Sequence, residues 1–143
     1  MAFPDLNREY ALQNKATGFY LMGRWLPEPE AAHTVFAAGD PESYWASKRW
    51  VLRESADQGL YQLVSSGGDG SGLVLDSNAE RQVYILGNNG ESYQKWRMID
   101  GGEGYWCLHN LATGYALDSN ADRDVYTHDP NDGAYRRWKF IAV

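Results

Sequence analysis

The chain has 143 residues, about the length of one domain, with 22% charged residues and a net charge of −6. Its scattered Lys and Arg argue against a nucleic-acid-binding face, and no apolar run reaches the ~20 residues of a membrane span. A single Cys excludes an internal disulfide. The unusual component is the 14% aromatic content, with six Trp and ten Tyr, because these side chains suit half-wet binding surfaces as well as cores.

Short apolar or alternating segments, separated by turn-rich clusters, follow one another along the chain, and each is typical of a β-strand. None carries the long 3.6-residue periodicity and caps of a helix, so helices should be minor. In chain order the predicted strands are 10–13, 19–22, 35–36, 50–52, 61–64, 73–75, 83–86, 96–99, 105–108, 115–117, 125–127 and 138–141. The sequence therefore predicts an all-β protein of twelve short strands.

These strands belong to an internal repeat. A shift of 42 aligns residues 72–96 with 114–138 without a gap, and 12 of the 25 positions are identical. A third, more divergent copy begins at 12–18, which matches 108–114, and it contains an insertion rich in Pro and Glu. We predict one domain, 1–143, of three four-strand repeats: repeat 1 near 8–54, repeat 2 near 58–100 and repeat 3 near 103–143.

The repeat length narrows the fold. A unit of ~45 residues buries too little apolar surface alone, so the three copies must share a core. WD40 blades also have four strands, but three blades are too few for a propeller of ~4–8. Three such units that close one barrel under a hairpin cap form a β-trefoil. In it, Trp50, Trp96 and Trp138 should be one core residue used three times, and Cys107 a small buried residue.

Repeats 2 and 3 carry a longer motif. The motif comprises Leu75-Asp76-Ser77-Asn78, Val83-Tyr84, Asn89-Gly90 and Tyr93-Gln94-Lys95-Trp96. It recurs in repeat 3 at the same spacing, except that Asp132, Arg136 and Arg137 stand in place of Gly90, Gln94 and Lys95. The Gln94-Lys95-Trp96 triplet resembles the Q-x-W signature of ricin-B-type β-trefoil lectins. The whole pattern most resembles actinohivin-type and pierisin-type lectin repeats. The resemblance implies a β-trefoil that binds sugars, and it is specific from about residue 60 onward.

A pyranose needs a carboxylate that accepts two hydrogen bonds, an amide that donates and accepts, and an aromatic plane for its C–H face. By resemblance, the Asp anchors sugar hydroxyls, the Asn completes a polar clamp and the Tyr pair supplies stacking. Leu86 would be an apolar wall in repeat 2, and His128 takes its place in repeat 3. The repeat 2 site is predicted to comprise Asp76, Tyr84, Leu86, Asn89 and Tyr93, and the repeat 3 site Asp118, Tyr126, His128, Asn131 and Tyr135.

Simpler interpretations stay open for some of these residues. An Asp-Ser-Asn run after a strand is often a turn whose side chains bond to backbone groups. In repeat 1 the anchoring position holds Met22, which cannot accept two hydroxyl hydrogen bonds, so we expect that site to be lost or changed. The inserted aromatics Trp25, Tyr44 and Trp45 suggest either loop packing or a new subsite.

Other chemistries fit less well. Residues 118–129 resemble the start of an EF-hand loop, but Arg123 stands where that turn needs Gly, so no metal is predicted. The three His are far apart in the sequence, with one in repeat 1 and two in repeat 3, and no catalytic motif occurs. Duplicated sites suggest repeated binding, so we expect no enzyme and no cofactor. Paired carboxylates for glycoside hydrolysis are possible in principle. The alternative function is a protein-interaction module, such as a protease inhibitor, that acts through the repeat 1 loops at 24–33 or 40–48.

The predicted partners are glycans or glycoconjugates, with no nucleic acid and no membrane insertion. Both galactose or N-acetylgalactosamine and mannose remain open, because the resembled repeats use the same Asp-Tyr-Asn set for either sugar. A homodimer also stays open. Residues 1–10 have neither a basic start nor an apolar stretch, so the expectation is a cytoplasmic or non-classically released protein.

Overall fold

The computed structural model describes residues 3–24, 34–39, 46–67 and 72–143. Within these segments it contains thirteen β-strands and two short 3-10 helices. The strands are β1 Glu9–Asn14, β2 Tyr20–Arg24, β3 Thr34–Ala38, β4 Ala46–Ser47, β5 Arg49–Glu54, β6 Tyr61–Ser65, β7 Val74–Ser77, β8 Val83–Leu86, β9 Trp96–Gly102, β10 Tyr105–Asn110, β11 Ala116–Ser119, β12 Val125–His128 and β13 Trp138–Ala142. The 3-10 helices are η2 Ser92–Gln94 and η3 Ala134–Arg136.

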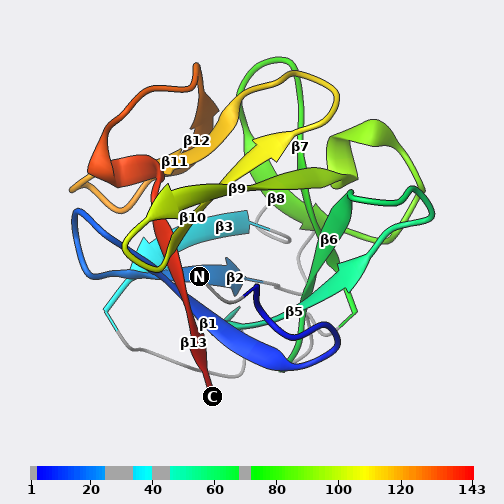
Figure 1. Ribbon diagram of the computed structural model, residues 1–143, viewed down its shortest axis with the longest axis horizontal. Helices are drawn as coiled ribbons and strands as arrows, with labels where there is room; N and C mark the ends of the chain where they lie inside the picture. Colours follow the sequence, from blue (N-terminus) through cyan, green and yellow to red (C-terminus); the bar gives the residue numbers. More distant parts are fainter. Residues whose placement is uncertain (1–2, 25–33, 40–45, 68–71) are drawn as a thin grey trace.

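Six strands form a closed barrel. Each strand pairs antiparallel with the next in the order β1, β5, β6, β9, β10 and β13, and β13 pairs with β1 to close the ring. The first and last strands, β1 and β13, are therefore neighbours in the barrel wall (Figure 1). Closure leaves these strands without a free edge, so their backbone N–H and C=O groups are paired within the barrel.

The remaining long strands form three hairpins, β2–β3, β7–β8 and β11–β12, one from each repeat. The hairpins touch one another in a ring. Thr34 bridges to Tyr84, Gln82 to Tyr126, and Phe36 to Asp124. Three hairpins that meet around one axis make the pseudo-threefold cap expected of three repeats on one barrel.

The three repeat-closing tryptophans lie in the core. Trp50, Trp96 and Trp138 are at most 1% exposed. Each indole Nε1 donates a hydrogen bond to a backbone carbonyl of a hairpin strand, at Leu21, Leu75 and Leu117 respectively, over 2.9–3.2 Å. A buried indole thus satisfies its one donor while its ring fills the barrel. The prediction of a threefold core Trp is confirmed, as is the burial of Cys107.

The all-β prediction is confirmed, with two differences in detail. The structure has thirteen strands rather than twelve, because the two-residue strand β4 pairs with β2 in repeat 1. Short 3-10 helices precede β9 and β13, where the expected connection was a turn. No helix in the described part of the chain has the length and apolarity that a membrane crossing needs.

Candidate functional site

The predicted repeat 2 and repeat 3 sites are built on equivalent hairpins. Asp76 is the third residue of β7 and pairs in register with Tyr84 of β8, and Asp118 pairs with Tyr126 in the same way on β11 and β12. Both carboxylates are largely buried, with 3% and 6% exposure. Because paired residues of an antiparallel ladder point to the same face, each hairpin places a carboxyl beside a phenol ring.

The Ser and Asn of the Asp-Ser-Asn run hold the hairpin turn. Ser77 Oγ donates to the Gln82 carbonyl at 2.8 Å, and Asn78 Oδ1 accepts the amide protons of Glu80 and Gln82. Repeat 3 has the same three bonds. The turn interpretation of the sequence is therefore correct for two of the three residues, and the Asp remains as the group directed elsewhere.

One oxygen of each Asp is fixed by the backbone. Asp76 Oδ1 accepts the Ser77 amide proton at 2.7 Å, and Asp118 Oδ1 accepts that of Ser119 at 2.8 Å. These bonds fix the orientation of both carboxyl groups.

The two hairpin tyrosines are also held. Tyr84 Oη donates to the Ser77 carbonyl at 2.9 Å, and Tyr126 Oη donates to that of Ser119 at 3.0 Å. Burial, followed by the nearby Asp charge, raises the pKa of both phenols, so both stay protonated at neutral pH and keep these donors. Each ring is thereby fixed beside its carboxylate.

In repeat 2, Gln94 joins the parts of the site. Its Nε2 donates to Asp76 Oδ2 at 3.0 Å and to the Gly87 carbonyl at 2.9 Å, while its Oε1 accepts the Asn89 amide proton at 2.9 Å. The side chain is 0% exposed. One buried amide therefore fixes both the anchoring carboxylate and the loop that carries Asn89.

In repeat 3, Arg136 occupies this place and makes different contacts. Its Nη1 lies 2.7 Å from Cys107 Sγ and its Nη2 lies 3.4 Å from Asp132 Oδ1. Burial raises the pKa of Asp118, although the Ser119 amide, His128 and Arg136 each act to lower it. The repeat 3 carboxylate is thus less stabilised in its ionised form than an exposed carboxylate would be.

The predicted residues of repeat 3 line one pocket of about 340 Å³. Gly133 contributes to the rim, at the position equivalent to Glu91 in repeat 2. A Cβ at Gly133 would lie 2.7 Å from Asn131 Oδ1, which accepts the Gly133 amide proton, so a larger residue would displace the Asn131 side chain. The lining comprises Asp118, Ser119, Asn120, Tyr126, His128, Asn131, Gly133 and Tyr135.

Tyr93 and Tyr135 are exposed on the two 3-10 helices. An asparagine at the end of another barrel strand holds each helix. Asn110, the last residue of β10, donates through Nδ2 to the Tyr93 carbonyl, and Asn14, the last residue of β1, donates to that of Tyr135. These two asparagine contacts were not predicted from the sequence, although both residues lie in the repeated segments 12–18 and 108–114. Nor was Gln94 predicted as a positioning group.

The other predicted residues lie around these sets. Leu86 and His128 end β8 and β12 with exposed side chains. Asn89 Oδ1 accepts the Glu91 amide proton, so its carbonyl oxygen already has a partner. The structure brings Asp76, Tyr84, Asn89 and Tyr93 around Gln94 and its loop, whereas Leu86 lies at the end of the same hairpin.

Repeat 1 has no equivalent carboxylate. Met22 is fully buried in β2 opposite Phe36, the counterpart of the tyrosines, so an apolar pair replaces the Asp–Tyr pair. The insertion aromatics Trp25, Tyr44 and Trp45, and most of the loops 24–33 and 40–48, lie outside the described residues. Among the described residues, no group of three or more His, Cys, Asp or Glu is placed to hold a metal ion.

The sequence profile described as ricin-type β-trefoil lectin domain-like matches residues 46–129, more than half of the chain. The chain belongs to this family. Membership of this lectin-like family supports carbohydrate binding as the function class. No curated protein matches the sequence at a significant level.

Solved structures share the fold of this lectin-like domain. The designed threefold-symmetric protein ThreeFoil has a TM-score of 0.76 at 22% identity, over 94% of this chain and 99% of that chain. SeviL bound to asialo-GM1 saccharide has a TM-score of 0.73 at 14% identity, over 94% and 97%. The exo-β-1,3-galactanase from Clostridium thermocellum has a TM-score of 0.77 at 23% identity, over 99% of this chain and 31% of the enzyme. These likenesses confirm the β-trefoil fold.

Proposed function

We propose that this protein is a non-catalytic lectin that recognises glycan sugars through two shallow sites, one in repeat 2 and one in repeat 3. The observation that carries the proposal is the duplicated pair of a buried, backbone-oriented carboxylate and a fixed tyrosine, Asp76 with Tyr84 and Asp118 with Tyr126. A carboxylate has acceptor capacity beyond one or two protein hydrogen bonds, and a polyol supplies two hydroxyl donors to such a group.

The geometry suits a sugar ring. Adjacent hydroxyls would donate to the carboxylate, and the Nδ2 amide of Asn89 or Asn131 would donate to a further ring oxygen. The exposed rings of Tyr93 and Tyr135 offer flat faces for C–H contacts beside these polar groups. A few convergent polar groups next to apolar surface are the usual composition of a small-ligand site.

Two sites on one rigid domain suit clustered or branched glycans. A single open sugar site binds weakly, typically near the millimolar end of the affinity scale. A second site on the same body raises the avidity through effective concentration without any new contact. The proposed mechanism is therefore bivalent capture rather than tight binding at one site.

Two sugar types are proposed as alternatives, from the resemblance of repeats 2 and 3 to pierisin-type and actinohivin-type repeats. One is galactose or N-acetylgalactosamine, and the other is mannose. Both residues at the matching position, Leu86 and His128, lie at the outer ends of their hairpins, where they would contact the ligand differently. The two sites therefore need not share one preference.

Binding without catalysis is the better proposal for this chain. The similar galactanase is aligned over only 31% of its length, so most of that enzyme lies outside the shared fold. The candidate carboxylates here are duplicated at equivalent repeat positions, whereas glycoside hydrolysis needs one pair across one scissile bond.

A glycan array tests the proposal with wild type, Asp76→Ala, Asp118→Ala and the double variant. Each single variant should lose part of the signal, and the double variant should lose at least about tenfold in apparent affinity. Asp122→Ala removes an exposed turn carboxylate from the same hairpin as Asp118 and should leave the array unchanged. Unchanged binding by the double variant contradicts the assigned sites. A blank array for the wild type favours the protein-interaction alternative.

A further inference from the structure

A second pocket lies on the pseudo-threefold axis, between the three hairpins, and has a volume of about 690 Å³. We name it the axial pocket, and its lining includes Val35, Val83, Val125, Tyr84, Tyr126 and Glu80. We propose that the axial pocket is an extension of the repeat 3 site and receives the next neutral sugar residue of an oligosaccharide whose end is bound by Asp118. This inference rests on the proposed lectin function.

The pocket has an apolar base built by all three repeats. Val35, Val83 and Val125 occupy the first or second positions of β3, β8 and β12, and each is only 8–9% exposed. The bridges from Thr34 to Tyr84 and from Gln82 to Tyr126 tie the strands together around it. The base is therefore part of the rigid cap and is formed before any ligand arrives.

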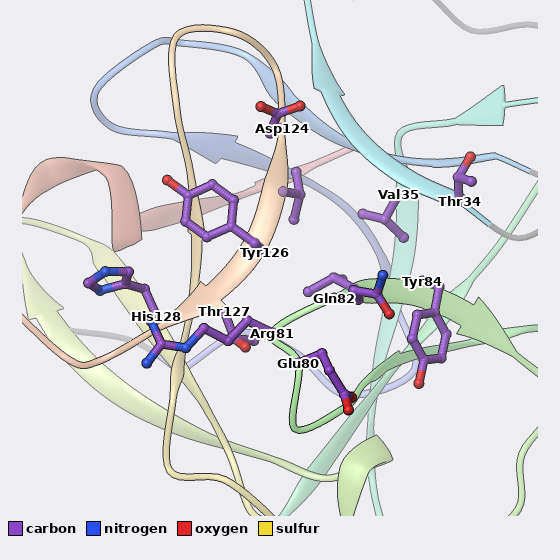
Figure 2. Close-up of a pocket in the computed structure, with 12 residues that line it drawn as sticks. Thr34, Val35, Glu80, Arg81, Gln82, Tyr84, Asp124, Tyr126, Thr127 and His128 are labelled. Atoms are coloured by element: carbon purple, nitrogen blue, oxygen red, sulfur yellow. The ribbon is translucent and has the colours of Figure 1, made fainter.

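Two aromatic rings stand on either side of this base. Figure 2 shows Tyr126 on one side of the pocket and Tyr84 on the other. Both phenols are held by bonds to the Ser77 and Ser119 carbonyls, so the rings keep their orientation. Fixed aromatic faces over an apolar base suit the C–H surface of a pyranose at little conformational cost.

The axial pocket and the repeat 3 pocket share two lining residues, Tyr126 and His128. A ligand in the 340 Å³ repeat 3 pocket therefore contacts two side chains that also line the axial pocket. Their combined size exceeds what one sugar ring needs, since pockets of ~300–1,000 Å³ hold drug-sized ligands. The continuity indicates a chain of at least two residues rather than a separate small molecule.

The polar groups of the axial pocket favour a neutral, hydroxyl-rich residue. The Glu80 carboxylate has no hydrogen-bond or ion-pair partner in the described chain and is free to accept sugar hydroxyls. The Arg81 guanidinium is already engaged, 3.7 Å from Asp129 Oδ1 and over the Tyr115 ring. With Asp124 also in the lining, carboxylates outnumber the free cations, which disfavours an acidic sugar.

Calorimetry on the Asp76→Ala background, which leaves only the repeat 3 site, tests the inference. The ligands are methyl α-mannoside with mannotriose, and methyl β-galactoside with galactotriose. For the sugar that binds, the trisaccharide should bind about tenfold more tightly than the methyl glycoside. Thr34→Trp, which fills the axial pocket from an exposed rim position, should abolish that gain and leave monosaccharide affinity unchanged.

Glu80→Ala should remove part of the gain, and Asp122→Ala is its matched control. Asp122 has the same position in the repeat 3 turn but does not line the axial pocket, so its loss should leave both affinities unchanged. Two outcomes overturn the extended subsite but not the lectin function. One is equal affinity for monosaccharide and trisaccharide when the axial pocket is unsubstituted, and the other is a trisaccharide gain in affinity that persists in Thr34→Trp. Absence of binding by every sugar contradicts the lectin function as well.

Discussion

The repeat 2 and repeat 3 sites have the same hairpin, carboxylate and tyrosine but differ in the side chain that follows the exposed tyrosine, which is Gln94 in repeat 2 and Arg136 in repeat 3. Gln94 both donates and accepts, so it bonds to the Asp76 carboxylate, the Gly87 carbonyl and the Asn89 amide at once. Arg136 has five donors and no acceptor. It therefore cannot bond to a loop amide in the same way, and it contacts Cys107 and Asp132 instead.

The exchange of Gln94 for Arg136 shows that a duplicated motif does not produce equivalent sites. Repeat 2 is preorganised because one amide fixes its carboxylate and its loop. Repeat 3 has Gly133 where repeat 2 has Glu91, and its pocket shares Tyr126 and His128 with the axial pocket. Preorganisation lowers the ordering cost of binding, whereas an open, extended pocket gains from additional contacts. We expect repeat 2 to discriminate single sugars and repeat 3 to respond to chain length.

The largest expected effect comes from removing the amide that distinguishes the two sites. Gln94→Ala leaves Asp76 Oδ2, the Gly87 carbonyl and the Asn89 amide without their bonds. Loss of a buried hydrogen-bonding partner costs about 1–3 kcal/mol per unsatisfied group, so thermal unfolding should show a clearly lowered stability. On the Asp118→Ala background, calorimetry should show at least about tenfold weaker sugar binding at repeat 2.

Arg136→Ala is the matched variant in repeat 3. Since Arg136 makes no bond to Asp118, its loss should leave sugar affinity at repeat 3 within about twofold on the Asp76→Ala background. If the two alanine variants weaken their own sites equally, the contrast between the two repeats is wrong.

A smaller effect should follow from exchanging the rim residues. Gly133→Glu places a Cβ 2.7 Å from Asn131 Oδ1, so the Asn131 side chain must shift, and the Glu side chain narrows the repeat 3 pocket. Affinity at repeat 3 should fall about fivefold to tenfold, measured by calorimetry on the Asp76→Ala background. Glu91→Gly is the reverse exchange at an exposed position and should change repeat 2 affinity little. Unchanged binding by Gly133→Glu would show that this rim does not shape the site.

Much of the fold follows from the sequence because the repeat and its periodicity are local signals. The core role of Trp50, Trp96 and Trp138 could be predicted since each lies near the start of the last apolar strand of its repeat, at a matching position. The strand β4 could not, because two residues carry no periodicity and their pairing with β2 depends on the insertion in repeat 1. The 3-10 helix at Ser92–Gln94 depends on Asn110, a residue of the next repeat, which no local pattern shows.

The candidate site could be predicted as a set of residues but not as an arrangement. The motif identified Asp76, Tyr84 and their repeat 3 equivalents, and the structure pairs them in register. It did not reveal that Gln94 joins the carboxylate to the loop, because those partners are 18 and 7 residues away along the chain. The axial pocket exists only where hairpins of three repeats meet, so no single repeat contains its signal.

The smallest expected effect is a pH dependence at repeat 3. Burial raises the pKa of Asp118, so this carboxyl becomes protonated at a higher pH than an exposed Asp does. The ionised form accepts the sugar hydroxyls, so binding should be full above the raised pKa and be lost as the pH falls through it. On the Asp76→Ala background, affinity should be halved at the pH where half of Asp118 is protonated, a value that carboxyl-carbon NMR reports independently. Asp118→Asn should bind more weakly but with a flat profile, and His128→Gln separates any contribution of the neighbouring imidazole. A profile that survives in Asp118→Asn would assign the pH dependence to another group and remove this distinction between the two sites.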